Sequence, residues 1–384
     1  MTHADLKRPA RPAGRFGRHG APICIAAALL IPAVASAQAN GCGTSGQGTT
    51  TCSPGQAPNG PLPPYLFNGF AALDIHTLQQ MANWSNAMLG LGTSTFLGKG
   101  DTYHTLGGSV YDRSWRDQGG TIIENGQSIA GTPTRTTSKG WELHDIYDAG
   151  RRFGLPDDQS LIVAGFANVS QSRTHFIDVA NTAGENDVSL SLAAAYRIRD
   201  YYVIGALDGV SGRVHLDELH GNGKGGYANK GLEGRVLVGR RIKLIDPSSH
   251  AFALSADIGG YGGYLVGHSD AFTDSSARAY GQGRAKSWLA GAKFTLEADV
   301  PQGALLWSPY AGLTYDHYIS PHISVDATPY EGAISYVGRK SLGGIETGVA
   351  VSNASNLSLD FKLYSQQNSQ LRTAGAVVAL SHPF

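Results

Sequence analysis

Apolar and polar side chains alternate with a period of two along most of the chain after about residue 101. The clearest run places one set of side chains on one face and Ser, Ala and Arg on the other; the first set is Val188, Leu190, Leu192, Ala194, Tyr196 and Ile198. Two further runs, at 288–300 and 357–364, repeat the pattern. Because successive side chains of a β-strand point to opposite faces, these runs predict strands with one apolar and one polar face.

About ten such runs can be counted, and two more strands are expected within 102–150, where the alternation is weaker. The ten lie near 160–170, 187–199, 201–214, 227–245, 250–267, 279–300, 304–319, 331–351, 356–368 and 371–384. Short polar turns join several neighbours, and longer loops, at 215–226, 268–278 and 320–330, fall in alternate gaps. Short turns on one side and long loops on the other are typical of a transmembrane barrel.

Strand length and the chemistry of the two faces favour a membrane barrel. A strand that spans a bilayer needs ~9–11 residues, whereas strands of soluble proteins average ~5–6. After the N-terminal region no stretch has the ~18 apolar residues that a transmembrane helix requires. In hydrocarbon only helices and closed barrels satisfy every backbone hydrogen bond. The expected fold is therefore all-β: an antiparallel up-and-down barrel of about twelve strands, preceded by a short helix.

The polar faces of the runs carry charges, which would be costly in contact with lipid. We therefore expect these side chains to line a wet lumen: Arg197, Arg199, Glu233, Arg235, Arg241, Lys243, Asp257, Lys293, Glu297, Glu346, Asp360 and Lys362. The alternative is a soluble sandwich whose charges face bulk water. Tyrosines near strand ends favour the membrane, because aromatic girdles mark bilayer interfaces; they are Tyr201, Tyr202, Tyr261, Tyr264, Tyr315, Tyr318, Tyr330 and Tyr336.

The first hundred residues divide into three segments before a barrel domain at 101–384. Residues 1–37 have the basic start, apolar stretch and small-x-small end of a secretory signal peptide, with a short membrane anchor as the alternative. Residues 38–67 predict a disordered or disulfide-looped leader. Within it, Cys42 and Cys52 are expected to pair in an exported protein, unless they remain two unpaired thiols.

Residues 68–90 have the spacing of an amphipathic helix, and with their linker they extend to residue 100. Phe70, Leu73, Met81, Trp84 and Met88 fall on one face, Asn68 can cap the start, and glycines follow the end. This helix is expected to plug or traverse the pore, or to pack under a loop.

The last strand closes with the most specific signal. Val378, Leu380 and Phe384 share one face, and the chain ends at Phe384. This resembles the assembly signal of bacterial outer-membrane proteins, although His382 and Pro383 depart from it. With a helix followed by a barrel of this length, residues 101–384 resemble the autotransporter β-barrel domain of type V secretion. The resemblance implies twelve strands and a helix in the lumen.

Two features depart from that family. Autotransporters carry a long passenger, whereas here about 30 residues separate the signal from the helix, and no repeat array is present. The self-cleaving members cut between paired asparagines, and this chain has no Asn-Asn dipeptide. Cleavage of that kind is therefore not expected.

Composition excludes several functional classes. Charged residues make up 16% of the chain, against about 25% in soluble domains. The net charge is zero, and it becomes slightly acidic once the basic signal is removed, so no nucleic-acid partner is expected. The glycine run near 221–226 has no following helix or Lys-Ser/Thr pair, and no hydrolase elbow or metalloprotease motif occurs. We expect no enzyme, metal or cofactor.

The expected protein is a barrel in the outer membrane of a Gram-negative bacterium that provides a hydrophilic pore for translocation or display of an N-terminal segment. Its expected partners are outer-membrane lipids and the barrel assembly machinery. The alternatives are a porin-like channel, and a surface adhesin or rim enzyme that uses the long extracellular loops.

Overall fold

The computed structural model describes residues 102–384 apart from short gaps. The gaps are 118–120, 125–126, 131–133, 152–154, 157, 178–180, 218–223, 247–250, 274, 276–278, 281, 328–329, 335–340, 356, 370 and 384. The predicted signal peptide, leader and helix at 68–90 lie outside the described residues. No helix among the described residues is long and apolar enough to cross a membrane.

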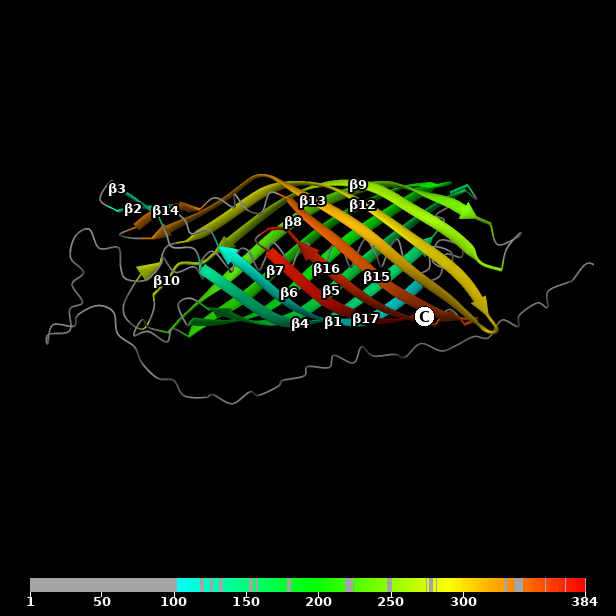
Figure 1. Cartoon of the computed structure of the whole chain (residues 1–384), viewed down its shortest axis with the longest axis horizontal. Coiled ribbons are helices and arrows are strands. Elements are labelled where there is room, and N and C mark those ends of the chain that lie inside the picture. Colours follow the sequence, from blue (N-terminus) through cyan, green and yellow to red (C-terminus); the bar gives the residue numbers. More distant parts are fainter. Residues whose placement is uncertain are drawn as a thin grey trace, which may run out of the picture. The chain divides into compact units, whose positions relative to one another are not determined.

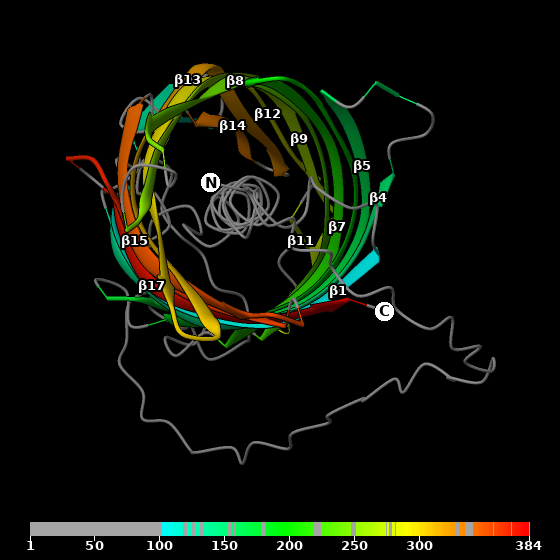
Figure 2. The ribbon, with the colours of Figure 1, turned by 90° about the vertical axis from the view of Figure 1, so that its right-hand side faces the viewer.

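Twelve long antiparallel strands of the described chain form the wall of a closed barrel (Figures 1 and 2). They are β1 (Thr102–Asp117), β4 (Thr134–Arg151), β5 (Gln159–Phe176), β6 (Asn181–Ile198), β7 (Tyr201–Asp217), β8 (Gly225–Ile245), β9 (Ala253–Ser269), β12 (Gly283–Gln302), β13 (Leu305–Ala327), β15 (Ser341–Asn353), β16 (Ser358–Gln367) and β17 (Leu371–Pro383). Each strand pairs with the next in chain order, and β17 pairs with β1 to close the sheet. Closure leaves the wall without an unpaired edge.

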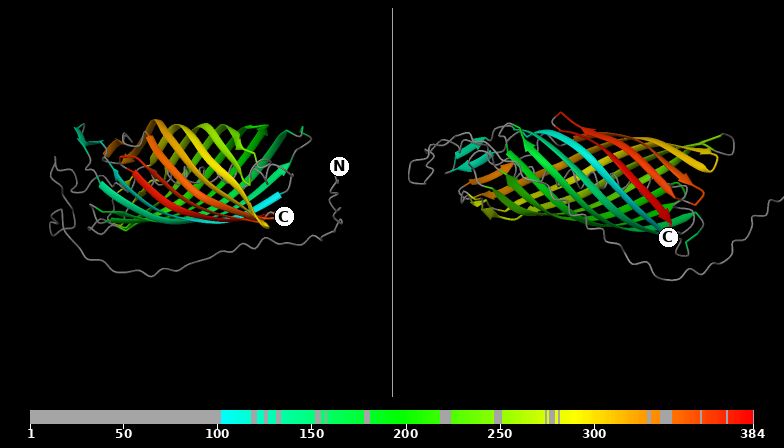
Figure 3. Two further views of the ribbon diagram at one scale, coloured as in Figure 1. Left: turned by 45° about the vertical axis from the view of Figure 1, so that its right-hand side comes forward. Right: turned by 90° about the horizontal axis from the view of Figure 1, so that it is seen from below.

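The pairing register gives the barrel its stagger. A row of register partners that starts at Arg241 in β8 and passes once around the wall returns to β8 at Tyr227, fourteen positions earlier. Stagger and tilt are linked in a closed barrel, and tilts of ~35–45° are usual. The strands in Figure 3 run at a steep slant to the barrel axis. A barrel of this size leaves an interior wider than two opposing side chains fill.

The two ends of the barrel differ. At one end, called here the short-turn end, β1 begins, β17 ends and compact turns join neighbours such as β6 to β7 and β12 to β13. The opposite, long-loop end carries the extra strands β2 (Thr121–Glu124), β3 (Gln127–Ala130), β10 (Phe272–Thr273), β11 (Ala279–Tyr280) and β14 (Tyr330–Ile334). These short strands lie at the left of Figure 1. In outer-membrane barrels the short turns face the periplasm and the longer loops face outward.

The fold confirms the predicted all-β closed barrel and its strand number. The two strands expected within 102–150 are β1 and β4, with the small hairpin β2–β3 between them. One predicted strand was wrong: 331–351 contains β14 and β15, separated by residues that the structure does not describe. β14 continues the pairing of β13 beyond the barrel rim, where it also meets β2. Alternation alone cannot separate a wall strand from a rim hairpin.

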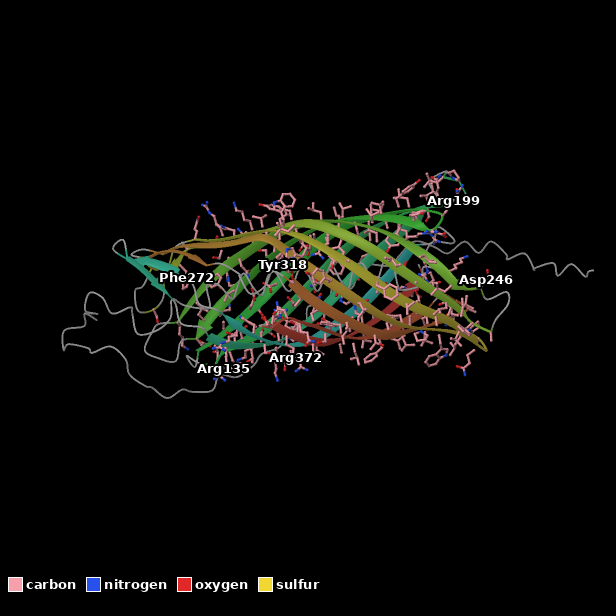
Figure 4. All side chains as sticks on the ribbon, turned by 45° about the horizontal axis from the view of Figure 1, so that its top comes forward. Arg135, Arg199, Asp246, Phe272, Tyr318 and Arg372 are labelled. Carbon is pink, nitrogen blue, oxygen red and sulfur yellow. The ribbon has the colours of Figure 1, made fainter. Side chains whose placement is uncertain are left out.

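Side chains alternate between a buried inner face and an exposed outer face. On β6, Leu190 and Leu192 each expose 66% of their surface, whereas Ser189 and Ser191 are buried. Figure 4 shows the outer face covered by side chains along the whole wall. Exposed large apolar residues on nearly every wall strand produce a continuous apolar band. Such a surface is stable in hydrocarbon and not in water.

The tyrosine pairs divide between the two faces, which corrects their assignment to girdles as a group. Tyr201, Tyr264 and Tyr315 point outward, but their neighbours Tyr202, Tyr261 and Tyr318 lie inside. Outward Trp307 and Tyr315 are eight residues apart on β13. At ~3.3 Å per residue and a tilt near 40° this corresponds to roughly 20 Å along the axis, close to the ~25 Å height of an apolar band. The side chains of Tyr330 and Tyr336 lie outside the described residues.

Inner tyrosines lie against glycines of the adjacent strand. Five wall strands each place a tyrosine opposite a glycine register partner; the pairs are Tyr111–Gly140, Tyr202–Gly239, Tyr261–Gly291, Tyr310–Gly348 and Tyr364–Gly375. A Cβ at any of these glycines would lie within 2.5 Å of the tyrosine ring or hydroxyl. Glycine is therefore required at these positions because the ring occupies the space of a side chain. This close packing gives one reason for the 51 glycines of the chain.

Candidate functional site: the charged inner face of the barrel

Ten of the twelve predicted lumen residues share the inner face of the wall. They are Arg197, Glu233, Arg235, Arg241, Asp257, Lys293, Glu297, Glu346, Asp360 and Lys362. Arg199 and Lys243 depart from the prediction. Arg199 lies in the tight turn between β6 and β7 with a left-handed backbone (φ 53°), its side chain is 79% exposed, and it pairs with Asp158. Lys243 is exposed near the end of β8, beside the register shift that precedes Ile245. Both lie at the short-turn end because alternation ends where a turn begins.

An arginine with two carboxylates forms the clearest cluster on the inner face. Arg241 and Asp257 are register partners on β8 and β9, with Nη1 and Oδ2 3.4 Å apart. The other terminal nitrogen of Arg241 donates to Glu297 of β12 at 2.8 Å. The guanidinium reaches both because its donors form a planar fork. Three strands are thereby joined through charged side chains that are nearly buried.

A second cluster lies along the same strands toward the long-loop end. Arg235 pairs with Glu233, two positions away on β8, and its guanidinium lies over the ring of Tyr261, 5.3 Å from the centroid. The hydroxyl of Tyr261 donates to Asp316 at 2.6 Å. Residues two apart on a strand share a face, which explains how Glu233 and Arg235 meet. The cluster links β8, β9 and β13.

A third group covers β12 to β16. Lys293 lies 3.7 Å from Glu346, and the hydroxyl of Tyr310 donates to Asp360 at 3.3 Å. Lys362 is buried two positions from Asp360 on the same face. Buried charges are stable only when they are paired or hydrogen-bonded. The alternating signs along these strands meet that requirement.

Several inner acidic residues on the opposite part of the wall are absent from the set predicted from sequence. Glu142 accepts hydrogen bonds from Asn168 at 2.9 Å and Ser109 at 3.4 Å, and Asp208 accepts one from Ser191 at 2.5 Å. Glu185 accepts from Asn229. Each of these acids falls on the polar side of its alternating run, so counting every position of equal parity would have found them.

The inner face is therefore a lining of fixed charges of both signs, held by neighbouring strands. No group of three or more His, Cys, Asp and Glu side chains within the described part of the chain is arranged to hold a metal ion. The chemistry that this surface offers is solvation: it can replace water around a polar chain or solute without presenting an apolar wall.

The remaining predicted residues have separate places. Val378 and Leu380 lie on the outer face of β17, exposed beside β1. Phe384, the third residue of the predicted assembly signal, lies outside the described residues, and so do Cys42 and Cys52.

A closed antiparallel barrel with an apolar outer band and an inner lining of charges defines the class of transmembrane β-barrels. No protein-family model and no curated protein matches the sequence. Solved structures do match. The chain is similar to the transport unit of the autotransporter AIDA-I from Escherichia coli, with a TM-score of 0.56 and 13% identity over 79% of this chain and 96% of that one.

Two further autotransporter barrels match. The translocator domain of NalP from Neisseria meningitidis gives a TM-score of 0.51 and 13% identity over 80% of this chain and 98% of that one. The beta domain of the Bordetella autotransporter BrkA gives 0.47 and 12% over 72% and 99%. At these identities the first two show that the chain has the fold of an autotransporter translocator barrel.

Proposed function

We propose that this protein is an outer-membrane translocator barrel, whose hydrophilic lumen carries an N-terminal segment of the same chain to the cell surface. One structural observation carries the proposal: the charged lining encloses a lumen, and β1 begins at the short-turn end. The similarity in fold to the AIDA-I and NalP barrels supports it.

The topology makes the route specific. Residues that precede Thr102 join the wall at the short-turn end, which faces the periplasm in barrels of this type. A segment of those residues that reaches the cell surface therefore has to pass through the lumen. No route outside the wall is available to a polar chain, because unpaired backbone groups are costly in hydrocarbon.

The lining suits a polar polypeptide in transit. Arg241 with its two carboxylates and Arg235 with Glu233 present paired charges, which attract neither sign of charge strongly. Residues 38–67 consist largely of Gly, Ser, Thr, Gln, Asn and Pro. Such a segment gains little from an apolar wall and can exchange its hydrogen bonds with water for those of the lining.

An epitope tag inserted within residues 38–67 tests the proposal. On intact cells the tag should be cleaved by added protease and should bind antibody. A matched chain with the tag placed in the short turn after Asn353 should be protected until the outer membrane is permeabilised. A tag within 38–67 that stays protected in intact cells would contradict translocation.

The competing function is a porin-like channel. Purified protein in a planar bilayer would then conduct ions steadily with residues 68–90 present, and protease would not reach residues 38–67 on cells. In the translocator, conductance should rise when residues 68–100 are deleted, because the predicted helix occupies the pore. The expected partners are outer-membrane lipids and the barrel assembly machinery, which would recognise the strand that ends at Phe384. No enzymatic activity is part of this proposal.

A further inference from the structure

Basic side chains gather on the outer surface of the barrel at its long-loop end. The basic patch consists of Arg116, Arg135, Lys139, Arg173 and Arg372, on the strands β17, β1, β4 and β5. All five side chains are exposed and lie on the outward parity of their strands. Figure 4 labels Arg135 and Arg372, which lie near each other at the end of the barrel away from Arg199. None of these residues belongs to the lumen.

The register places like charges directly opposite each other. Arg116 faces Arg135 across β1 and β4, and Lys139 faces Arg173 across β4 and β5. Like charges at directly opposed positions destabilise a sheet. Beyond the apolar band, Asp112 is the one acidic side chain among the described outward residues of these four strands, and it pairs with Lys139 at 3.4 Å. One acid cannot balance five basic groups, so the patch favours an external anion.

The height of the patch identifies which anion it would meet. Two positions toward the short-turn end from Asp112 and Lys139, the outer face becomes apolar at Val110 and Trp141. The indole of Trp141 donates to Gln171 of β5 at 3.2 Å, as expected of an aromatic residue at the edge of a bilayer. The basic patch therefore begins where the hydrocarbon ends, at the level of lipid headgroups.

From this position we infer that the basic patch binds the phosphate groups of the phosphorylated glycolipid in the outer leaflet. Arginine suits this ligand because its planar fork binds phosphate oxygens in pairs. The four strands are about 4.8 Å apart, so the patch is roughly 15 Å wide. That width can contact two phosphate groups of one lipid headgroup at once. The inference needs the long-loop end to face outward, but it does not depend on translocation.

Binding of fluorescent lipid A to the purified full chain in neutral detergent micelles tests the inference. The double substitution Arg135→Gln with Arg173→Gln removes one charge from each opposed pair and should weaken binding roughly tenfold or more at physiological ionic strength. The matched control is Arg199→Gln with Arg240→Gln, which removes two exposed arginines at the short-turn end and should change the affinity less than twofold. A heat-modifiability gel establishes that each variant is folded.

The chemistry of the ligand is tested by three further probes. Dephosphorylated lipid A should bind as weakly to the parent chain as lipid A binds to the double variant. Phosphatidylglycerol should compete poorly, and inorganic phosphate should not compete at millimolar concentration. Equal binding of dephosphorylated lipid A, or equal loss in the control variant, would overturn the inference. Effective competition by phosphatidylglycerol would overturn the choice of glycolipid, and competition by inorganic phosphate would overturn the lipid source.

Discussion

Aromatic rings fit flat against the inner wall because glycine stands opposite them. Five tyrosines follow this rule, and in a sixth pair the ring of His144 occupies the space above Gly107. The rings stiffen the wall without filling the lumen, and they bring their hydroxyl groups toward charged neighbours, as Tyr261 and Tyr310 show. Packing and polar lining are thus provided by the same residues.

Substituting Gly348 by alanine tests this packing. Its Cβ would lie 2.5 Å from the hydroxyl of Tyr310 and 2.6 Å from the backbone oxygen of Phe361, and the second atom cannot move aside. We expect a loss of about 1–3 kcal/mol in the free energy of unfolding, measured by urea titration in detergent. Gly205→Ala is the control, since nothing lies within 4 Å of its Cβ. Equal stability of the two variants would show that the ring does not depend on the glycine.

The arginine of the β8–β9–β12 cluster should have a much larger effect than an exposed arginine. Arg241→Met leaves Asp257 and Glu297 nearly buried without the cation between them, so we expect a loss of about 3 kcal/mol in the free energy of unfolding. Arg199→Met removes an exposed pair with Asp158 and should cost under about 1 kcal/mol. Urea titration of both variants measures the difference. If Arg241→Met costs no more than Arg199→Met, the cluster is not a stabilising element.

The face on which a residue lies can be predicted from sequence, but its partners cannot. Parity along a strand is enough to place Arg235, Lys293 and Asp360 on the inner face. Parity says nothing about register, because register depends on the length and conformation of each turn. The ion pair of Lys293 with Glu346 and the tyrosine–glycine contacts join residues far apart in the chain, so they depend on the fold.

At the scale of the strands, the seam between β1 and β17 completes the barrel. The two strands pair along their length, from Tyr103 with Pro383 to Trp115 with Leu371. Alternation identifies β17 well and β1 poorly, since glycines and polar residues interrupt the apolar face of β1 at Gly108, Asp112 and Ser114. The charged residues among them lie beyond the apolar band, where a wall strand continues into the headgroup region and the lipid no longer requires apolar side chains.

A cysteine pair across this seam tests closure. Thr105 and Ser381 are register partners whose hydroxyl oxygens lie 2.7 Å apart on the inner face. In a chain whose own cysteines are replaced by serine, Thr105→Cys with Ser381→Cys should form a disulfide on mild oxidation, because such partners have the Cβ separation that a disulfide needs. The cross-linked chain should migrate faster than the reduced chain after full denaturation.

The pair Thr105→Cys with Thr373→Cys provides the control. Thr373 is the partner of Arg113, so this second pair is separated along the seam and should not cross-link. Cross-linking of both pairs, or of neither, would be inconsistent with the register at which the barrel closes.

At the scale of the whole molecule, one arrangement explains the surface and the interior together. The apolar outer band requires lipid, the charged inner lining requires water or a polar chain, and only a closed sheet separates the two. The basic patch then falls at the outward headgroup level and the start of β1 at the periplasmic mouth. The low charge of the composition indicates this class of protein, but the division of charges between lumen and headgroup level follows only from the barrel.

Spin labels placed one at a time at residues 188–193 of β6, in the cysteine-free chain reconstituted in lipid, measure this division directly. Labels at Val188, Leu190 and Leu192 should be reached by dissolved oxygen and shielded from a water-soluble nickel complex, and labels at Ser189, Ser191 and Ala193 should show the reverse. An alternation of opposite phase, or none, would contradict the outward placement of the apolar face.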